Sequence, residues 1–272
     1  LMTGRFAFRT GVVSNNAKSI SPQTETTIAT VLKQAGYATA EAGKWSQLPL
    51  MSSAEEGKAW GFDEFLKWDN AVGERYWKPA LNRNGQPVPV TEKSFGPDLL
   101  HEYAVDFITR HKDVPFFLYY PMTLIHAQLS PTPNGTSGKG LLADNIAYMD
   151  KLVGKLLAEL DNLKLRENTL VIFAGDNGLG GGGKINGREI SGSKGSMLEG
   201  GSRVPMIANW KGTIPAGGVV TDLVEFTDFY ATFAELAGAK LPEGVQLDSH
   251  SFAPQLKGEA GKPRQWVFIQ LN

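Results

Sequence analysis

Side chains able to bind a metal ion or an anion follow the apolar segments of this sequence. Asp176-Asn177-Gly178 comes directly after the apolar run 170–174. A carboxylate and a carboxamide oxygen are ligands that hard divalent cations such as Ca²⁺ or Mg²⁺ prefer. Asp, Asn and Gly also favour turns for backbone reasons alone. By itself, the triplet therefore predicts either a metal-ligand pair or an ordinary turn.

Lys44, His126 and Lys194 hold comparable positions. Lys44 closes a short extended segment, His126 follows the apolar run 115–121, and Lys194 lies in the glycine-rich segment after Asn177. Two lysines beside a metal ion suit a tetrahedral anion such as a sulfate or phosphate ester. A histidine there could orient the ester or transfer a proton to the leaving group. A single lysine is usually a solvated surface group, so the argument depends on a shared location.

The elements that must position these residues can be read from hydrophobic periodicity. Helical spacing predicts helices over 24–36, 99–111, 142–163 and 222–238. A short extended segment of small residues predicts a strand over 37–42, and apolar runs predict strands over 115–121, 169–174, 204–210 and 266–271. This alternation predicts an α/β fold with a mostly parallel, mixed central sheet sandwiched by helices. Parallel strands end at one edge of a sheet, so we expect Lys44, His126, Asp176 and the loop carrying Lys194 to meet there.

Residues 51–96 interrupt this alternation. They are rich in aromatic side chains and predict an irregular excursion that forms a lid or substrate wall, or simply packs on the main core. Within it, Asn82-Arg-Asn-Gly85 predicts the turn of a small hairpin. No internal repeat or clear linker divides the chain, so we expect one domain over 1–272.

Composition excludes some classes of function. The chain has 272 residues, of which 42% are hydrophobic and 20% charged, and its net charge is −1. This predicts a sizeable core and no strong attraction to nucleic acid. There is no cysteine, which excludes disulfides and thiolate metal sites. The longest apolar stretch, 114–125, is interrupted by two prolines and is too short to span a bilayer.

Several motifs, in order along nearly the whole chain, resemble the sulfatases of the alkaline-phosphatase-like superfamily. Leu1-Met-Thr-Gly-Arg5 resembles the end of the first sulfatase signature. Thr30-Val-Leu-Lys-Gln-Ala-Gly-Tyr37, followed by Gly43-Lys44-Trp45, resembles the second signature. Asp176-Asn177-Gly178 resembles the metal-binding triplet of the family. Lys194-Gly195, with Glu199-Gly-Gly-Ser-Arg-Val-Pro205, resembles its Lys-Gly-x-x-x-Glu-Gly-Gly-x-Arg-x-Pro block.

This resemblance implies an alkaline-phosphatase-like fold and the hydrolysis of sulfate esters of small molecules or saccharides. By matching positions, Lys44, His126 and Lys194 would bind the sulfate and act in catalysis. Asp176 and Asn177 would bind Ca²⁺, or Mg²⁺ or another divalent cation. The resemblance is consistent with a periplasmic or secreted location but leaves the compartment open.

In the resembled family the nucleophile is a formylglycine made from Cys or Ser, and two early aspartates complete the metal site. This chain has no matching nucleophile or aspartate pair, so we expect it to lack the N-terminal segment that carries them. Its carboxyl end is also short, so we expect it to lack the C-terminal subdomain. Losing the strand that carries the aspartates would expose sheet edges. We therefore expect a homodimer or a swapped segment.

Three alternatives remain open from the residues. A phosphodiester or phosphonate hydrolase of the same superfamily would use the same lysines and metal. A catalytically silent, sulfatase-like protein is favoured by the missing nucleophile and by Ser46, where the family usually has histidine. A carboxylic ester hydrolase could use Ser46, Ser191, Ser193 or Ser196 with His126 as base, although no Gly-x-Ser-x-Gly elbow is present.

Overall fold

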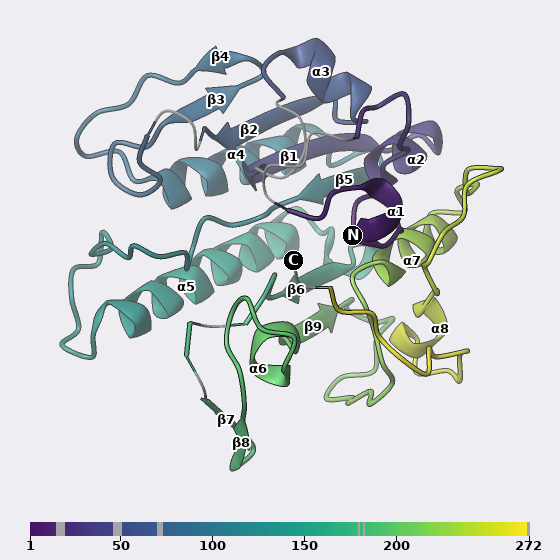
Figure 1. Cartoon of the computed structure of the whole chain (residues 1–272). Helices are drawn as coiled ribbons and strands as arrows, with labels where there is room; N and C mark the ends of the chain where they lie inside the picture. Colours follow the sequence, from purple (N-terminus) through teal and green to yellow (C-terminus); the bar gives the residue numbers. More distant parts are fainter. Residues whose placement is uncertain (15–19, 46–50, 70–72, 179, 182, 271–272) are drawn as a thin grey trace.

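The computed structural model describes every residue except 15–19, 46–50, 70–72, 179, 182 and 271–272 (Figure 1). Its main sheet has the strand order β4-β3-β2-β1-β5. The strands are β1 (Ala38–Lys44), β2 (Glu64–Trp68), β3 (Leu81–Arg83), β4 (Gln86–Pro87) and β5 (Phe116–Tyr119). β1 pairs in parallel with β2 and β5, whereas β2 with β3 and β3 with β4 are antiparallel. The mixed α/β sheet expected from the sequence is confirmed.

Two smaller sheets follow in the chain. β6 (Val171–Ala174) pairs antiparallel with β9 (Met206–Asn209), and β7 (Gly183–Ile185) forms a hairpin with β8 (Arg188–Ile190). The segment between β6 and β9 contains this hairpin and the single turn α6 (Glu199–Ser202) instead of a crossover helix. The chain returns through these elements, and β9 runs antiparallel to β6. Figure 1 shows the β7–β8 hairpin projecting away from the main sheet.

Helices cover both faces of the main sheet. The described helices are α1 (Ala7–Thr10), α2 (Ile28–Gln34), α3 (Ala54–Ala59), α4 (Gly96–Arg110), α5 (Leu141–Asn162), α6, α7 (Asp228–Leu236) and α8 (Ala253–Leu256), with a 3₁₀ turn at Arg166–Asn168. The four predicted helices are confirmed as α2, α4, α5 and α7, with α2 and α7 shorter than expected. At α2 the hydroxyl of Thr27 accepts from the N–H of Thr30 at 3.1 Å and caps the helix.

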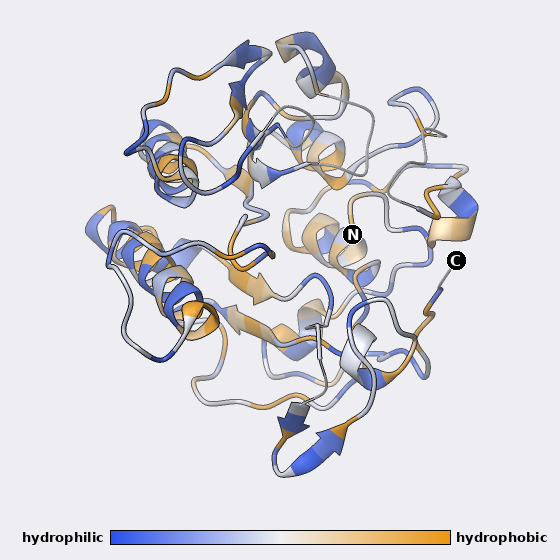
Figure 2. Ribbon diagram, turned by 60° about the vertical axis from the view of Figure 1, so that its left-hand side comes forward, coloured by the Kyte–Doolittle hydropathy of each residue, from blue (hydrophilic) through white to orange (hydrophobic). Residues whose placement is uncertain are grey.

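The two faces of the sheet bury different side chains. On one face Leu100 and Phe107 of α4 pack with Ala40 and Ala42 of β1. On the other, α2 and α7 pack together around the fully buried Tyr230. Figure 2 shows hydrophobic colour on the inward stripes of the long helices, while the β7–β8 hairpin is mostly hydrophilic. None of the described helices combines the length and apolar character needed to cross a membrane.

Residues 51–96 are more regular than expected. They contain α3 and the strands β2, β3 and β4. Phe65 and Trp68 are buried, because β2 is the middle strand of the sheet and is covered on both faces. The predicted hairpin turn is confirmed between β3 and β4, with Asn84 and Gly85 both at positive φ.

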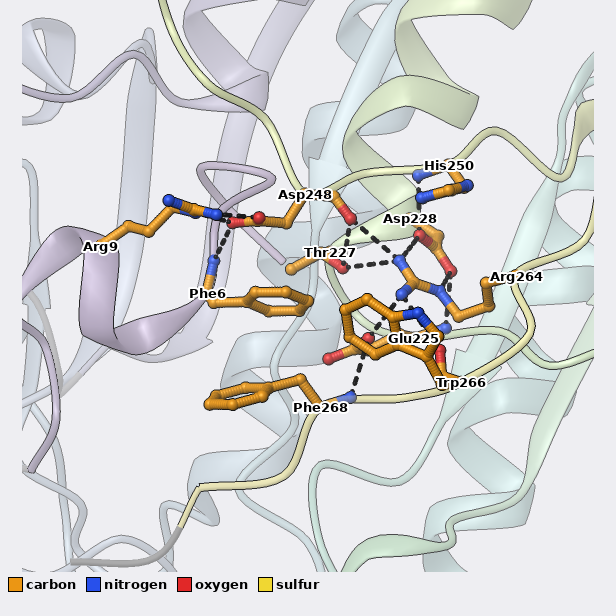
Figure 3. Close-up of polar contacts among 10 residues, drawn as sticks. All are labelled: Phe6, Arg9, Glu225, Thr227, Asp228, Asp248, His250, Arg264, Trp266 and Phe268. Carbon is orange, nitrogen blue, oxygen red and sulfur yellow. Dashed lines mark hydrogen bonds and ion pairs between the residues drawn. The ribbon is translucent and has the colours of Figure 1, made fainter.

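The expected strand over 266–271 is wrong, since residues 266–270 form no strand and 271 lies outside the described residues. The segment is instead held by Arg264, whose guanidinium forms an ion pair with the buried Asp228 and donates to the carbonyl of Asp248 at 2.9 Å (Figure 3). Beyond it the ring of Phe268 packs 4.8 Å from that of Phe6. The apolar run therefore covers the N-terminal segment instead of extending a sheet.

Candidate functional site

The carboxyl end of β1 places Lys44 beside the loop that follows β5. The N–H of Lys44 donates to the carbonyl of Pro121 at 2.8 Å. Gly43 has φ 140°, and a Cβ there would lie 2.1 Å from the same carbonyl oxygen. A glycine is required for this close approach, and it brings the segment carrying His126 against the end of β1.

Four of the predicted site residues share one electrostatic neighbourhood. Burial lowers the pKa of Lys44. The positive charges of Lys194 and Arg75 lower this pKa further, whereas the negative charge of Asp176 raises it. The pKa of His126 is also lowered, mainly by burial and further by the charges of Arg75, Lys194 and Lys44. Its contact with the backbone carbonyl of Ala127 acts in the opposite direction and raises this pKa. The structure thus brings Lys44, His126, Asp176 and Lys194 together, although β6 belongs to a different sheet from β1 and β5.

Arg75 is a site residue that the sequence reasoning missed. Its Nη1 donates to the carbonyl of Ala127 at 3.0 Å and to Nδ1 of His126. Its guanidinium carbon lies 4.4 Å from the centre of the Trp68 ring, which is a cation–π contact. The available signal was the aromatic-rich stretch around it, which predicted a lid, a substrate wall or packing on the core and singled out no cation.

The Asp176-Asn177-Gly178 triplet follows β6 and rests on the turn that contains α6. The N–H of Gly178 donates to the carbonyl of Gly201 at 2.9 Å. A Cβ on Gly178 would lie 1.8 Å from the carbonyl oxygen of Gly200. Asp176 is exposed and Asn177 is half-buried, so both remain accessible to a ligand.

Lys194 lies in a tight turn that packs on the same segment. The N–H of Ser196 donates to the carbonyl of Ser193 at 2.9 Å, and the N–H of Gly200 donates to the carbonyl of Ser191 at 2.8 Å. The side chain of Lys194 is exposed, although it still acts on Lys44 and His126. The glycine-rich block therefore holds the lysine and the Asp-Asn pair in one unit.

The site offers some, but not all, of the ligands that a divalent cation needs. Asp176 and Asn177 offer oxygen atoms of the right chemical type, whereas Ca²⁺ takes about 6–8 oxygen ligands. Among the residues that the structure describes, no three His, Cys, Asp or Glu side chains are grouped to hold a metal. The described residues therefore do not complete a calcium site.

The geometry also bears on the serine alternative. Ser46 lies outside the described residues. In the described part of the chain, Ser191, Ser193 and Ser196 form no hydrogen bond with His126, whose Nδ1 is instead contacted by Arg75. A nucleophilic serine needs a base within hydrogen-bond reach, so these three are not assembled for that chemistry.

Comparisons with known proteins agree with the motifs. The sulfatase family profile matches residues 1–239. Human arylsulfatase D is 28% identical over 98% of this chain and 61% of its own length. Mouse N-acetylgalactosamine-6-sulfatase is 33% identical over 95% of this chain and 56% of its own length. The chain thus spans a little over half the length of these curated relatives.

Solved structures give the same result. The crystal structure of PsFucS1 sulfatase from Pseudoalteromonas sp. superposes with a TM-score of 0.81 at 27% identity, covering 97% of this chain and 62% of that one. Ps i-CgsB superposes with a TM-score of 0.80 at 29% identity, covering 95% of this chain and 64% of that one. The fold, the motifs and the family profile agree, and the chain belongs to the sulfatase family.

Proposed function

We propose that this chain carries the ester-binding site of a sulfuric ester hydrolase. The observation that supports the proposal is the meeting of three cations, Lys44, Arg75 and Lys194, with one carboxylate, Asp176, beside His126. A cluster with excess positive charge at the end of a buried strand is stabilised by an anion. A sulfate ester presents one negative charge spread over oxygens that several separate donors can contact.

The residues would divide the work by their chemistry. Lys44 and Lys194 donate to the non-bridging sulfate oxygens and offset their charge. His126 contacts the bridging oxygen and donates a hydrogen bond to it as the alcohol leaves. Its lowered pKa keeps the imidazole neutral near pH 7, so it acts as a donor without adding to the positive charge around the anion.

Asp176 and Asn177 would supply two oxygen ligands of a divalent cation, with Ca²⁺ preferred to Mg²⁺. Such an ion would further neutralise the bound sulfate. The curated relatives act on aryl sulfates or on N-acetylgalactosamine 6-sulfate by their names, which supports a small aryl or saccharide sulfate ester as the substrate class. The formylglycine nucleophile is a family expectation that no residue described here supplies.

The test is a substrate panel on the purified chain, with and without Ca²⁺, using an aryl sulfate, an aryl phosphodiester and an aryl acetate. Binding of inorganic sulfate is measured in parallel by calorimetry. We expect sulfate to bind, and we expect Lys44→Ala or Lys194→Ala to weaken its binding about tenfold each through loss of a charge-assisted hydrogen bond. Lys184→Ala is the matched control, because that lysine lies in the projecting β7–β8 hairpin.

Each alternative has its own outcome in this panel. Preferential turnover of the phosphodiester would replace sulfate by phosphate chemistry, and turnover of acetate alone would favour a serine mechanism. Sulfate binding without turnover of any ester would favour a catalytically silent protein. Absence of sulfate binding would refute the proposed site. Light scattering during size-exclusion chromatography tests the proposed homodimer, which a clean monomer would contradict.

A further inference from the structure

We propose that Arg75 and Tyr76 together position His126, with Arg75 setting the tautomer of the imidazole and Tyr76 holding its backbone. Arg75 and Tyr76 would then be positioning residues that act through His126. This inference rests on the proposed function and adds to it the identity of the ring nitrogen that faces the ester. Neither residue belongs to the motifs that carry the family resemblance.

The tautomer follows from the donor inventory of the two side chains. A guanidinium has only N–H donors and stays charged, so a nitrogen that it contacts must accept. Nη1 of Arg75 contacts Nδ1 of His126 and also donates to the carbonyl of Ala127 at 3.0 Å. Nδ1 also lies close to that carbonyl. A carbonyl oxygen has two lone pairs and could also accept from a protonated Nδ1. A hydrogen bond from the charged guanidinium is roughly twice as strong as one between neutral groups, so the contact with Arg75 decides that Nδ1 accepts. The neutral ring therefore carries its proton on Nε2.

Arg75 is held rigidly enough to impose this choice. Its guanidinium packs over the buried Trp68 of β2 at 4.4 Å. Its backbone is pressed by the start of α4, where a Cβ on Gly96 would lie 2.1 Å from the carbonyl oxygen of Arg75. A side chain anchored at both ends loses less entropy when it binds His126, so the contact is favoured.

Tyr76 fixes the other side of the histidine. Its hydroxyl donates to the carbonyl of His126 at 2.6 Å and approaches that of Thr123 at 3.3 Å. Burial raises the pKa of Tyr76 to about 12, so the hydroxyl stays protonated and remains a donor. The N–H of Gly96 donates to the carbonyl of Tyr76 at 2.6 Å and ties the pair to α4.

The result is an N–H group available to a bound ester. In the part of the chain that the structure describes, Nε2 of His126 has no hydrogen-bond partner. Lys44, Lys194 and Arg75 surround the ring electrostatically and favour its neutral form. Nε2–H can then donate to an oxygen of the sulfate ester, whereas the opposite tautomer would present a lone pair to an anion.

The tautomer can be measured directly by NMR of the full chain labelled with ¹⁵N-histidine. The chain has 4 histidines, and His126→Gln assigns the relevant signals. Without sulfate at neutral pH, we expect the Nδ1 of His126 to resonate as an unprotonated nitrogen and Nε2 as a protonated one. Addition of inorganic sulfate should shift Nε2 more than Nδ1.

The variants separate positioning from simple charge. Arg75→Gln should give a mixture of tautomers and weaken sulfate binding about tenfold, the effect of one charge-assisted hydrogen bond. Lys194→Gln removes a positive charge from the same site and should leave the tautomer unchanged. Arg83→Gln is the matched control for a stacked arginine, since Arg83 lies 5.2 Å from the Tyr103 ring and contacts no site residue described here. Arg75→Lys retains a charged donor and should partly restore the wild-type spectrum.

A protonated Nδ1 in the wild-type chain would overturn the inference, whether or not sulfate binds. The same holds if Arg75→Gln, shown to be folded by its melting curve, keeps a single tautomer with Nε2 protonated. If the tautomer is as expected and calorimetry detects sulfate but Nε2 does not shift, the donor role is overturned while the proposed binding site stands. If calorimetry detects no sulfate, the proposed function fails and the donor role fails with it. The wild-type tautomer needs no variant, so an unfolded Arg75→Gln would not remove the test.

Discussion

Replacing Gly178 by alanine tests whether the Asp-Asn pair and the turn beneath it form one unit. A Cβ on Gly178 would lie 1.8 Å from the carbonyl oxygen of Gly200 and 2.9 Å from the Cα of Gly201. Both neighbours are backbone atoms, so no change of rotamer relieves the clash. The two segments must separate by roughly 1.5 Å or more to reach ordinary contact distance. That separation also breaks the hydrogen bond from Gly178 to the carbonyl of Gly201.

The expected cost follows from these two effects. Overpacking a tight contact costs about 1–3 kcal/mol, and a lost hydrogen bond costs about 1 kcal/mol. Together they lower the free energy of unfolding by about 2–4 kcal/mol. For a chain of 272 residues, this corresponds to a fall in Tm of roughly 4–7 °C. Because the displaced turn also carries Lys194, sulfate affinity should fall in the same variant.

Thermal and urea unfolding measure the stability change, and calorimetry with sulfate measures the functional one. Gly180→Ala is the matched control, since it lies in the same glycine-rich segment and a Cβ there meets no atom within 4 Å. Its stability should stay within about 0.5 kcal/mol of the wild type. If Gly178→Ala melts at the wild-type temperature and binds sulfate equally well, the described contact between triplet and turn is refuted.

Three further predictions concern the metal site and the buried charges. Because few ligands are present, Ca²⁺ should bind Asp176 with a Kd of about 1 mM, so 10 mM Ca²⁺ should raise Tm by roughly 3 °C; Asp176→Ala should abolish the shift, and an unshifted wild type would contradict the site. Glu41 is fully buried, and burial raises its pKa well above the ordinary value, with Lys67 opposing. A carboxyl group whose pKa is raised by folding stabilises the protein below its unfolded pKa, and this stability is lost as pH rises through the folded pKa. In urea titrations, the free energy of unfolding of Glu41→Gln relative to wild type should therefore increase with pH. A difference that is independent of pH would exclude this effect. Arg264→Met should lower the free energy of unfolding by about 3–5 kcal/mol because Asp228, whose side chain is 2% exposed, keeps a buried charge without its partner; a loss below about 1 kcal/mol on chemical unfolding would show that the pair is dispensable.

Local patterns were sufficient for most elements. The long amphipathic stretch that becomes α5 repeats apolar side chains over 22 residues, and the Asn84-Gly85 turn satisfies a hairpin through positive φ. Asp176 could be placed at a strand end because the apolar run 170–174 stops just before it, and Lys44 because it closes a short extended segment. These signals depend only on residues that are close in the sequence, so they can be read without knowledge of the fold.

Other features depended on contacts between distant segments. Residues 266–270 have the composition of a strand, yet the Arg264 ion pair with Asp228 and ring packing on Phe6 keep them out of a sheet. The antiparallel pairing of β6 with β9 depends on how the intervening chain turns back. The composition and hydrophobic period of a strand are the same whether it pairs in parallel or antiparallel. The sequence pattern therefore could not predict the direction or the partner of β6.

The sequence by itself determined the α/β class, the family motifs and the identity of Lys44, His126, Asp176, Asn177 and Lys194 as candidates. Only the tertiary structure decided that Lys44, His126, Asp176 and Lys194 meet across two separate sheets. It also added Arg75, which approaches His126 from 51 residues away. The physical reason is that spacing along the chain specifies which faces of an element are apolar. The contact between the guanidinium of Arg75 and the imidazole of His126 forms only when β2, α4 and the loop after β5 pack together.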